Sequence, residues 1–150
     1  MIIHIFNGNI VLPSRKIVFK KFIDFYNKKC SKNTAYSNAA ANIDILDFNI
    51  LPSLNNYWLS GFTDAEGCFT ASFLSNSQAF RLRFILSQKG DKNLPILSHF
   101  ILLFNAGVIE AHSIKQNYSY VLSGKKNCYN IYSYFDKFSL KTKKYTSYVL

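Results

Sequence analysis

The segment LSGFTDAEG, residues 59–67, carries two carboxylates, Asp64 and Glu66, directly before a glycine. The segment has the pattern of a helix that stops at Gly67, so both acids lie at its carboxyl end. The helix dipole disfavours each negative charge there by about 0.3–1 kcal/mol. A bound cation would offset this cost, and oxygen ligands without a nearby His or Cys favour Mg²⁺ or Ca²⁺. An ordinary helix end with a solvated Glu66 explains the same residues, and both interpretations stay open at this point.

The elements that position these acids follow from the hydrophobic periodicity of residues 54–150. Apolar residues at helical spacing predict helices, and alternation of apolar and polar residues predicts half-buried strands. In chain order we expect a helix over 55–64, strands over 68–74 and 79–88 with a turn at Asn76 and Ser77, a helix capped by Asp91, strands over 108–114 and 118–123, and helices over 127–136 and from 140. The simplest packing is an α+β fold in which helices cover one face of a four-stranded antiparallel sheet.

Alternation within the strands also assigns side chains to the two faces of the sheet. The helix-covered face takes the apolar set Phe69, Ala71, Phe73, Leu82, Phe84 and Leu86. The opposite face takes Thr70, Ser72, Leu74, Arg81, Arg83, Ile85, Glu110, His112, Ser119 and Val121. A two-stranded ribbon fits the DNA major groove, where arginine reads guanine. Phosphate contacts are expected from Lys89, Lys92, Lys115, Lys125 and Lys126.

The charge balance supports a polyanionic partner. Eighteen Lys and Arg against eight Asp and Glu give a formal net charge of +10, which favours nucleic acid first and an anionic membrane surface second. No apolar run reaches the length of a membrane span. Three separated cysteines without a C-x-x-C pair argue against a zinc site or a disulfide framework. Abundant Ile, Asn, Lys, Phe and Tyr are typical of an AT-rich genome such as that of an organelle.

The first third of the chain is less informative. Asn7-Gly8 predicts a turn between two short strands over residues 1–13. Ser14 is expected to cap a helix that runs to about Lys28. The stretch from Cys30 to Pro52 has weak apolar order and is interpreted as a linker with one short helix or strand near Ile43–Phe48.

The segment WLSGFTDAEGCF, residues 58–69, closely resembles the signature of LAGLIDADG homing endonucleases. Residues 84–89, 105–109 and 138–144 resemble later parts of the same family, so the resemblance covers residues 54–150. It implies the family's αββαββα half with a saddle-shaped sheet, whose last helix is cut off at the chain end. Residues 1–53 resemble the end of a preceding half plus a linker, although no first motif is present.

The resemblance implies a homing endonuclease that hydrolyses phosphodiester bonds in a long double-stranded DNA site with Mg²⁺ or another divalent cation. In this family two motif helices pack side by side and each delivers one acid to the metal centre. By position, Glu66 and the backbone carbonyl of Ala65 match the metal ligands, whereas Asp64 supports the helix end. The residues that match the solvent-organising set are Gln88, Lys92 and Lys141. The helix-pairing residues are Leu59, Gly61, Phe62 and Ala65.

Two alternatives stay open alongside the endonuclease. The first is an intron RNA maturase on the same fold, with intron RNA as its partner, and the second is an inactive fragment. His112 is expected to face the groove or solvent and not to bind metal. A second LAGLIDADG half is the expected protein partner, either upstream in the same chain or through homodimerisation. The resemblance to fungal mitochondrial members implies a mitochondrial location.

Overall fold

The computed structural model describes residues 2–32, 42–75 and 79–149. The chain divides into two compact units, Met1–Leu51 and Pro52–Leu150. None of the helices in the described ranges is both long and apolar enough to cross a membrane.

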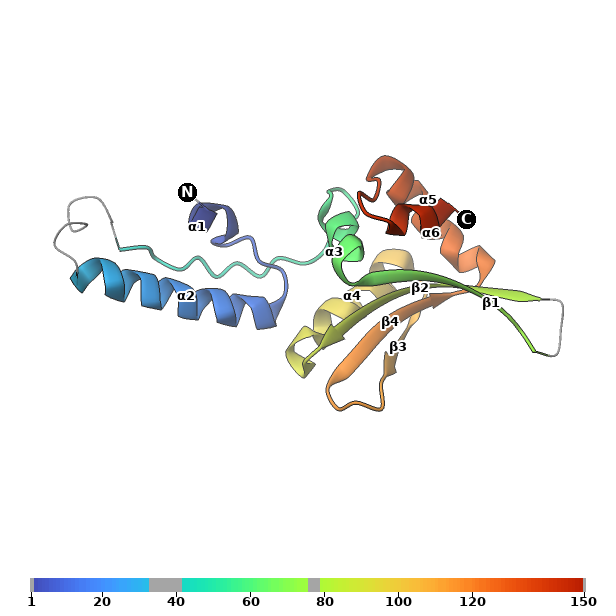
Figure 1. The fold of residues 1–150 in the computed structure, drawn as a ribbon, viewed down its shortest axis with the longest axis horizontal. Coiled ribbons are helices and arrows are strands. Elements are labelled where there is room, and N and C mark those ends of the chain that lie inside the picture. The colour runs from blue at the N-terminus through green and yellow to red at the C-terminus, as the bar shows by residue number, and fades with distance from the viewer. Residues whose placement is uncertain (1, 33–41, 76–78, 150) are drawn as a thin grey trace. The chain divides into compact units, whose positions relative to one another are not determined.

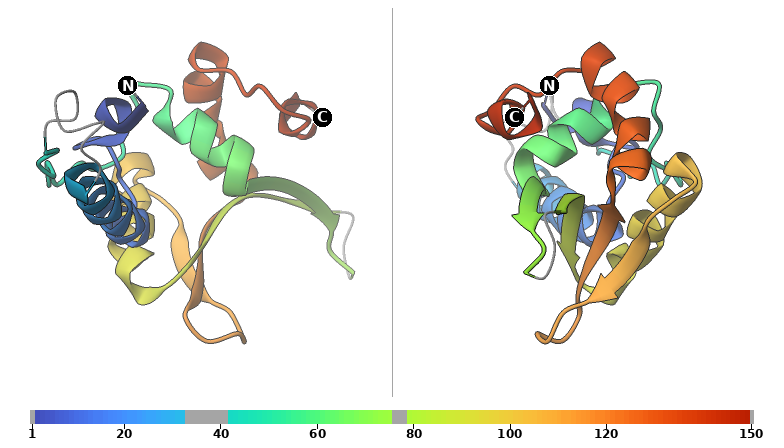
Figure 2. Two further views of the ribbon diagram at one scale, coloured as in Figure 1. Left: turned by 60° about the vertical axis from the view of Figure 1, so that its left-hand side comes forward. Right: turned by 90° about the vertical axis from the view of Figure 1, so that its right-hand side faces the viewer.

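The second unit contains the predicted antiparallel sheet of four strands, in the order β1-β2-β4-β3 (Figure 1). Its elements are α3 (Trp58–Glu66), β1 (Gly67–Phe73), β2 (Phe80–Lys89), the 3₁₀ turn η1 (Asp91–Asn93), α4 (Leu94–Phe104), β3 (Val108–Ala111), β4 (Asn117–Ser123), α5 (Lys125–Lys137) and α6 (Lys144–Val149). The sheet is strongly curved, with α3 and α5 on one side of it (Figure 2). The α+β class and the αββαββα order predicted from the sequence are confirmed.

The core lies between the sheet and its helices. Phe84 and Leu86 of β2 and Tyr120 and Leu122 of β4 have no exposed surface, and the strand register pairs Phe84 with Leu122 and Leu86 with Tyr120. The helices add an aromatic layer, in which the ring centroids of Phe62 and Phe100 are 6.4 Å apart. At the free end of the β1–β2 hairpin, Phe73 is on the helix side but is 85% exposed.

Position 107 requires a glycine because of its backbone conformation and because the Tyr120 ring lies close to it. Its φ of +96° is a conformation that side chains rarely adopt, and a Cβ atom there would lie 2.4 Å from the Tyr120 ring. The Tyr120 hydroxyl donates to the carbonyl of Ala106 at 2.9 Å, and burial raises the pKa of Tyr120 well above its usual range. The glycine therefore lets the α4–β3 turn close over this ring.

Several element boundaries differ from the sequence prediction. α3 begins at Trp58 and not near Asn55, because the Asn56 side-chain oxygen accepts the Trp58 N–H at 3.0 Å. Asp91 does not cap the following helix, since it begins a 3₁₀ turn and accepts the Tyr118 hydroxyl at 2.7 Å. The last helix begins at Lys144 and not near Leu140. The predicted turn at Asn76 and Ser77 lies outside the described residues.

The first unit contradicts the predicted hairpin at residues 1–13. Ile2–Phe6 forms a short helix, α1, and Pro13–Lys32 forms the long helix α2. The Asn7 N–H donates to Ile3 at 2.9 Å, and Gly8 follows with a φ of +81°. Asn-Gly therefore ends a helix here, a role that the same two residues fill as well as a hairpin turn.

Residues 42–51 form neither the short helix nor the short strand predicted near Ile43–Phe48. They lie extended, and asparagine side chains of the same unit hold their backbone. Asn7 bonds the Asp44 carbonyl at 2.8 Å and the Leu46 N–H at 2.9 Å, and Asn27 bonds both backbone groups of Ile43 at 3.0 Å. These side-chain bonds replace the ladder bonds of a strand.

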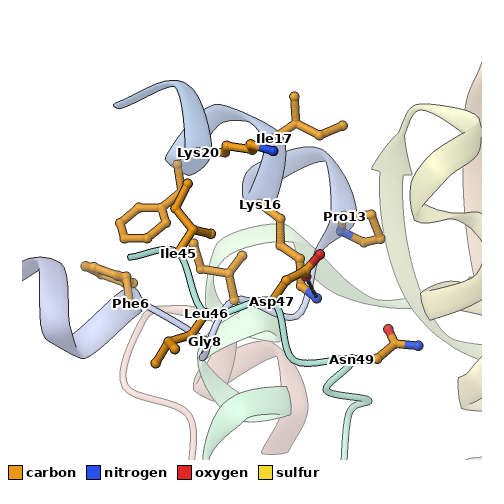
Figure 3. Close-up of a pocket in the computed structure, with 12 residues that line it drawn as sticks. Phe6, Gly8, Pro13, Lys16, Ile17, Lys20, Ile45, Leu46, Asp47 and Asn49 are labelled. Atoms are coloured by element: carbon orange, nitrogen blue, oxygen red, sulfur yellow. Dashed lines mark hydrogen bonds and ion pairs between the residues drawn. The ribbon is translucent and has the colours of Figure 1, made fainter. Parts of the chain in front are cut away.

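Beside this segment is an apolar groove of about 360 Å³ (Figure 3). Phe6, Phe19 and Leu46 contribute to its lining, with Lys16 and Asp47 as an ion pair at 3.2 Å. Among the described residues that line the groove, Asp47 is the only acid and none is a histidine or cysteine. We therefore place the candidate chemistry in the second unit.

Candidate active site and nucleic-acid interface

The carboxyl end of α3 leads directly into β1 at Gly67. The backbone there is extended, with φ −84° and ψ 164°, so this glycine is not needed for a left-handed turn. It is needed for space, because a Cβ atom would lie 2.8 Å from the Thr63 methyl and 2.9 Å from its Cα. The immediate change from helix to strand leaves Glu66 exposed at the end of the sheet where β1 begins.

Asp64 ties this helix end to the loop before α6. Its Oδ2 accepts the Lys141 N–H at 2.8 Å, and its Oδ1 accepts the Thr142 N–H at 3.2 Å and the Thr142 hydroxyl at 2.6 Å. Burial alone would raise the pKa of Asp64, but these hydrogen bonds and the nearby charge of Lys144 outweigh it and lower that pKa. The structure thus gives Asp64 the supporting position expected for it.

Lys144, which the sequence analysis did not single out, occupies the negative end of the α3 dipole. Its Nζ donates to the carbonyls of Thr63 and Ala65, both at 3.1 Å. The predicted Lys141 instead directs its Nζ to the Ser139 hydroxyl at 3.1 Å, and only its backbone reaches α3. The lysine cluster at 141–144 is visible in the sequence, but the loop conformation decides which lysine turns toward α3.

Gln88 and Lys92 lie at the same end of the sheet as Glu66. The register pairs Gly67 with Leu86, so Gln88 follows Leu86 where Glu66 precedes Gly67. Gln88 is only 9% exposed, and its oxygen lies 3.5 Å from the Asn93 amide nitrogen. Asn93 also donates to the Lys89 carbonyl at 2.9 Å. Lys92 is exposed in η1. A ligand at this end of the sheet would therefore meet Lys92 at the surface and Gln88 in a buried position.

The oxygen atoms at the carboxyl end of α3 are suitable ligands for a hard cation. Glu66 is exposed, and the described residues offer it no hydrogen bond or ion pair; the Ala65 carbonyl is oriented toward the ammonium of Lys144 at 3.1 Å. Carboxylate and carbonyl oxygens are the ligands that Mg²⁺ and Ca²⁺ take. No group of three His, Cys, Asp or Glu side chains within metal-binding reach of one another occurs in the described part of the chain. Glu66 is therefore a candidate ligand with no competing partner among the described residues, and the Ala65 carbonyl, which already accepts from Lys144, has a second lone pair for a cation.

The structure divides the predicted helix-pairing residues into an exposed pair and a buried pair. Gly61 and Ala65 are exposed on one side of α3, and a Cβ atom at Gly61 would meet nothing within 4 Å. Leu59 and Phe62 are 0% and 7% exposed and pack into the core, so their assignment to the pairing surface is wrong. The helical period turns them away from the Gly61–Ala65 side.

The register places the predicted binding residues on the sheet face opposite the helices. Thr70 pairs with Arg83 and Ser72 with Arg81, and the Nε of Arg83 is buried without a hydrogen-bond partner among the described residues. The same face also takes Ile85 of β2 and Glu110 of β3. His112, directly after β3, lies on it too, with its Nε2 atom 2.7 Å from the Ser119 hydroxyl. Ser119 and Val121 lie on the same face but are only 1% and 3% exposed. We therefore assign these two no direct contact with a ligand.

The predicted phosphate-contacting lysines are all exposed and lie around the edges of this face. Lys89 ends β2, Lys115 lies in the turn between β3 and β4, and Lys125 and Lys126 form the first turn of α5. Two lysines at a helix amino end are unfavourable for the helix dipole. An anion bound there would offset that cost, which is consistent with a phosphate role.

Comparison with known proteins identifies the class to which this fold and site belong. Residues 59–150 match the family model described as LAGLIDADG endonuclease. The chain belongs to this family. It is 38% identical over 151 residues to "Probable intron-encoded endonuclease 4" of Neurospora crassa. That match covers 98% of this chain and 25% of the relative, so the chain spans about a quarter of that protein.

Solved structures of the family share the fold. The homing endonuclease I-GzeII, in complex with a DNA target, matches with a TM-score of 0.60 and 21% identity, over 85% of this chain and 47% of that one. I-CvuI, in complex with the I-CreI target in the presence of 2 mM Mg, matches with a TM-score of 0.53 and 18% identity, over 62% and 60% of the two chains.

Proposed function

We propose that this chain is one catalytic half of a homing endonuclease that hydrolyses phosphodiester bonds in double-stranded DNA. One observation carries the proposal: the motif helix α3 presents an exposed Glu66 at the end of a sheet whose open face displays Arg81 and Arg83. The net charge of +10 supports a polyanionic substrate. The family membership supports DNA as that substrate.

The residues at the α3 end have distinct roles in this proposal. The carboxylate of Glu66 and the carbonyl of Ala65 hold a divalent cation, for which Mg²⁺ is the first candidate because structures of the family have been determined with Mg and Ca. When bound, such a cation activates water and stabilises the developing negative charge on the phosphate. Lys144 supplies fixed positive charge at the same helix end. Gln88 and Lys92 organise solvent around the phosphate, and Asp64 positions the loop that carries Lys144.

One acidic helix supplies half of a two-helix centre, so the proposal requires a second half. The exposed Gly61–Ala65 side of α3 is smooth enough for a partner backbone to approach closely. A preceding half in the same reading frame is the first candidate, with residues 1–53 as its end plus the linker, and homodimerisation is the second. A mitochondrial location accords with the intron-encoded fungal relative. A role as an intron RNA maturase is not favoured, because the Neurospora relative and I-GzeII are both named for endonuclease activity.

The proposal is tested by complementation. The chain alone, and the chain mixed with an upstream half expressed from the host gene, are incubated with duplex DNA of the intronless allele in Mg²⁺. We expect weak nicking by the chain alone, cleavage of both strands by the mixture, and loss of cleavage on addition of EDTA. Absence of cleavage by the mixture would support the inactive-fragment alternative, and efficient cleavage by a 17.2 kDa monomer would overturn the two-half arrangement.

A further inference from the structure

A chain of three side-chain hydroxyl and imidazole groups crosses the open face of the sheet. The hydroxyls of Ser87 on β2 and Ser119 on β4 are 2.6 Å apart, and the Nε2 atom of His112, directly after β3, lies 2.7 Å from the Ser119 hydroxyl. Ser119 is 1% exposed, whereas His112 is exposed and Ser87 is half-buried. The middle group of this hydrogen-bonded series is therefore buried, and the two end groups, Ser87 and His112, lie on the face that we propose contacts DNA.

The position of the Ser119 hydroxyl proton determines whether Ser87 and His112 act as hydrogen-bond donors or acceptors on the open face. Ser119 has one hydroxyl proton, and among the described residues its side-chain hydrogen bonds are to Ser87 and His112, so one of these two receives the proton. If it donates to Ser87, the histidine donates through Nε2, Nδ1 is a free acceptor, and the Ser87 proton points outward. If it donates to His112, then Ser87 donates to Ser119, Nδ1 carries the proton, and Ser87 presents only lone pairs. In both neutral states the face shows one donor and one acceptor.

Protonation of His112 leaves only one of these two hydrogen-bond arrangements possible. The imidazolium donates from both nitrogens, so Ser119 must donate to Ser87, and the Ser87 hydroxyl proton points outward. The face then shows two donors. In the major groove adenine presents one donor and one acceptor, N6 and N7, whereas guanine presents two acceptors, N7 and O6.

We propose that Ser87, Ser119 and His112 form a switchable hydrogen-bond relay that sets the base preference at one position of the DNA site. Ser87 and His112 contact the base edge, Ser119 is a positioning residue, and acidic conditions shift the preference from adenine toward guanine. The charged groups around the relay are Glu110 on β3, Lys89 on β2 and Lys115 in the β3–β4 turn. This inference rests on the proposed DNA binding.

The test is selection from a random duplex DNA pool by the full chain at about pH 7.5 and about pH 5.5, on either side of the range in which imidazoles take up a proton. The variants are Ser119→Ala and His112→Gln. Ser133→Ala, at an exposed position on α5 away from this face, is the matched control. Circular dichroism verifies that each variant is folded.

For the unaltered chain and Ser133→Ala we expect the guanine-to-adenine ratio at one position to rise about five- to tenfold at the lower pH, as for a good paired base contact. His112→Gln should abolish that change, and Ser119→Ala should reduce the discrimination at both pH values. If Ser119→Ala matched the unaltered chain at every position, or the pH effect persisted in His112→Gln, the relay would be refuted while DNA binding stood. Selection of no sequence by the unaltered chain, even with the second half supplied, would instead refute the proposed function.

Discussion

Replacing Asp64 by Asn tests the connection between the motif helix and the loop that carries Lys144. Two of the three hydrogen bonds that Asp64 accepts go to Oδ1 and one, from the Lys141 N–H, goes to Oδ2. Asn can keep the two bonds to one oxygen, but its NH₂ group then faces the Lys141 N–H, and the charge is lost. A hydrogen bond to a charged group contributes about 1.5–3 kcal/mol.

Because Asp64 is only half-buried, we expect a smaller loss of about 1–2 kcal/mol in the free energy of unfolding. For a chain of this length that corresponds to a fall of about 2–8 °C in the midpoint of thermal unfolding. Calorimetry at neutral pH measures this fall. The same variant loosens the loop that holds Lys144 against α3, so cleavage by the complemented enzyme should also decrease.

The pH dependence gives a second signature. The pKa of Asp64 is lowered in the folded state, so its stabilising contribution is complete above the unfolded-state pKa of about 3.9 and is lost as the pH falls through the lower folded value. The stability difference between the unaltered protein and Asp64→Asn should therefore narrow below about pH 4. An unchanged unfolding midpoint, or a difference that stays constant with pH, would refute the assigned role.

Three further predictions concern close packing, pairing and DNA binding. In chemical denaturation Gly90→Ala, with φ +97° and ψ 129° but open space, should cost about 1–3 kcal/mol of unfolding free energy from backbone strain alone. Gly107→Ala, with a similar φ, should cost more because its Cβ would also lie 2.4 Å from the Tyr120 ring, and an equal loss in the two variants would contradict this close approach. Gly61→Leu should leave unfolding of the isolated chain nearly unchanged but weaken association with the second half in sedimentation experiments, and equal association would exclude this face. Arg83→Ala should relax sequence preference in binding assays, whereas Lys125→Ala should weaken binding to all sequences alike and reduce the salt slope by about one; identical effects on target and random DNA would contradict the face assignment.

The fold of residues 54–150 could be predicted because local pattern and tertiary packing agree there. Strand alternation is strict, so the placement of Phe84 on the helix side and of Arg83 on the opposite side follows from parity alone. The pairing of Phe84 with Leu122 does not, because it joins two strands that are not connected by a hairpin turn. The hairpin predicted at residues 1–13 failed because Asn-Gly is compatible with both a turn and a helix end. What decided between them was the bonding of Asn7 to residues 44–46, about forty positions away, which no local pattern contains.

The candidate site was predictable where the motif itself fixes geometry and was missed where a loop does. Glu66 follows from its position before Gly67, and Asp64 from its place in the last turn of α3. The choice of Lys144 over Lys141 depends on the backbone of residues 139–142, which Asp64 holds through hydrogen bonds from Lys141 and Thr142. The burial of Leu59 and Phe62 depends on the rotational phase of a nine-residue helix, and both sides of that helix carry small or apolar residues.

The central claim is that Glu66 supports metal-dependent cleavage, and Glu66→Gln in the complemented enzyme tests it most directly. Asp24→Asn, at an exposed position on α2, is the matched control because it removes the same single negative charge. The measurement is the single-turnover cleavage rate in Mg²⁺ together with the affinity for the same duplex DNA. We expect Glu66→Gln to bind DNA at least as tightly as the unaltered enzyme but to lose cleavage, and Asp24→Asn to retain both. A Glu66→Gln enzyme that cleaves at the unaltered rate would contradict the account.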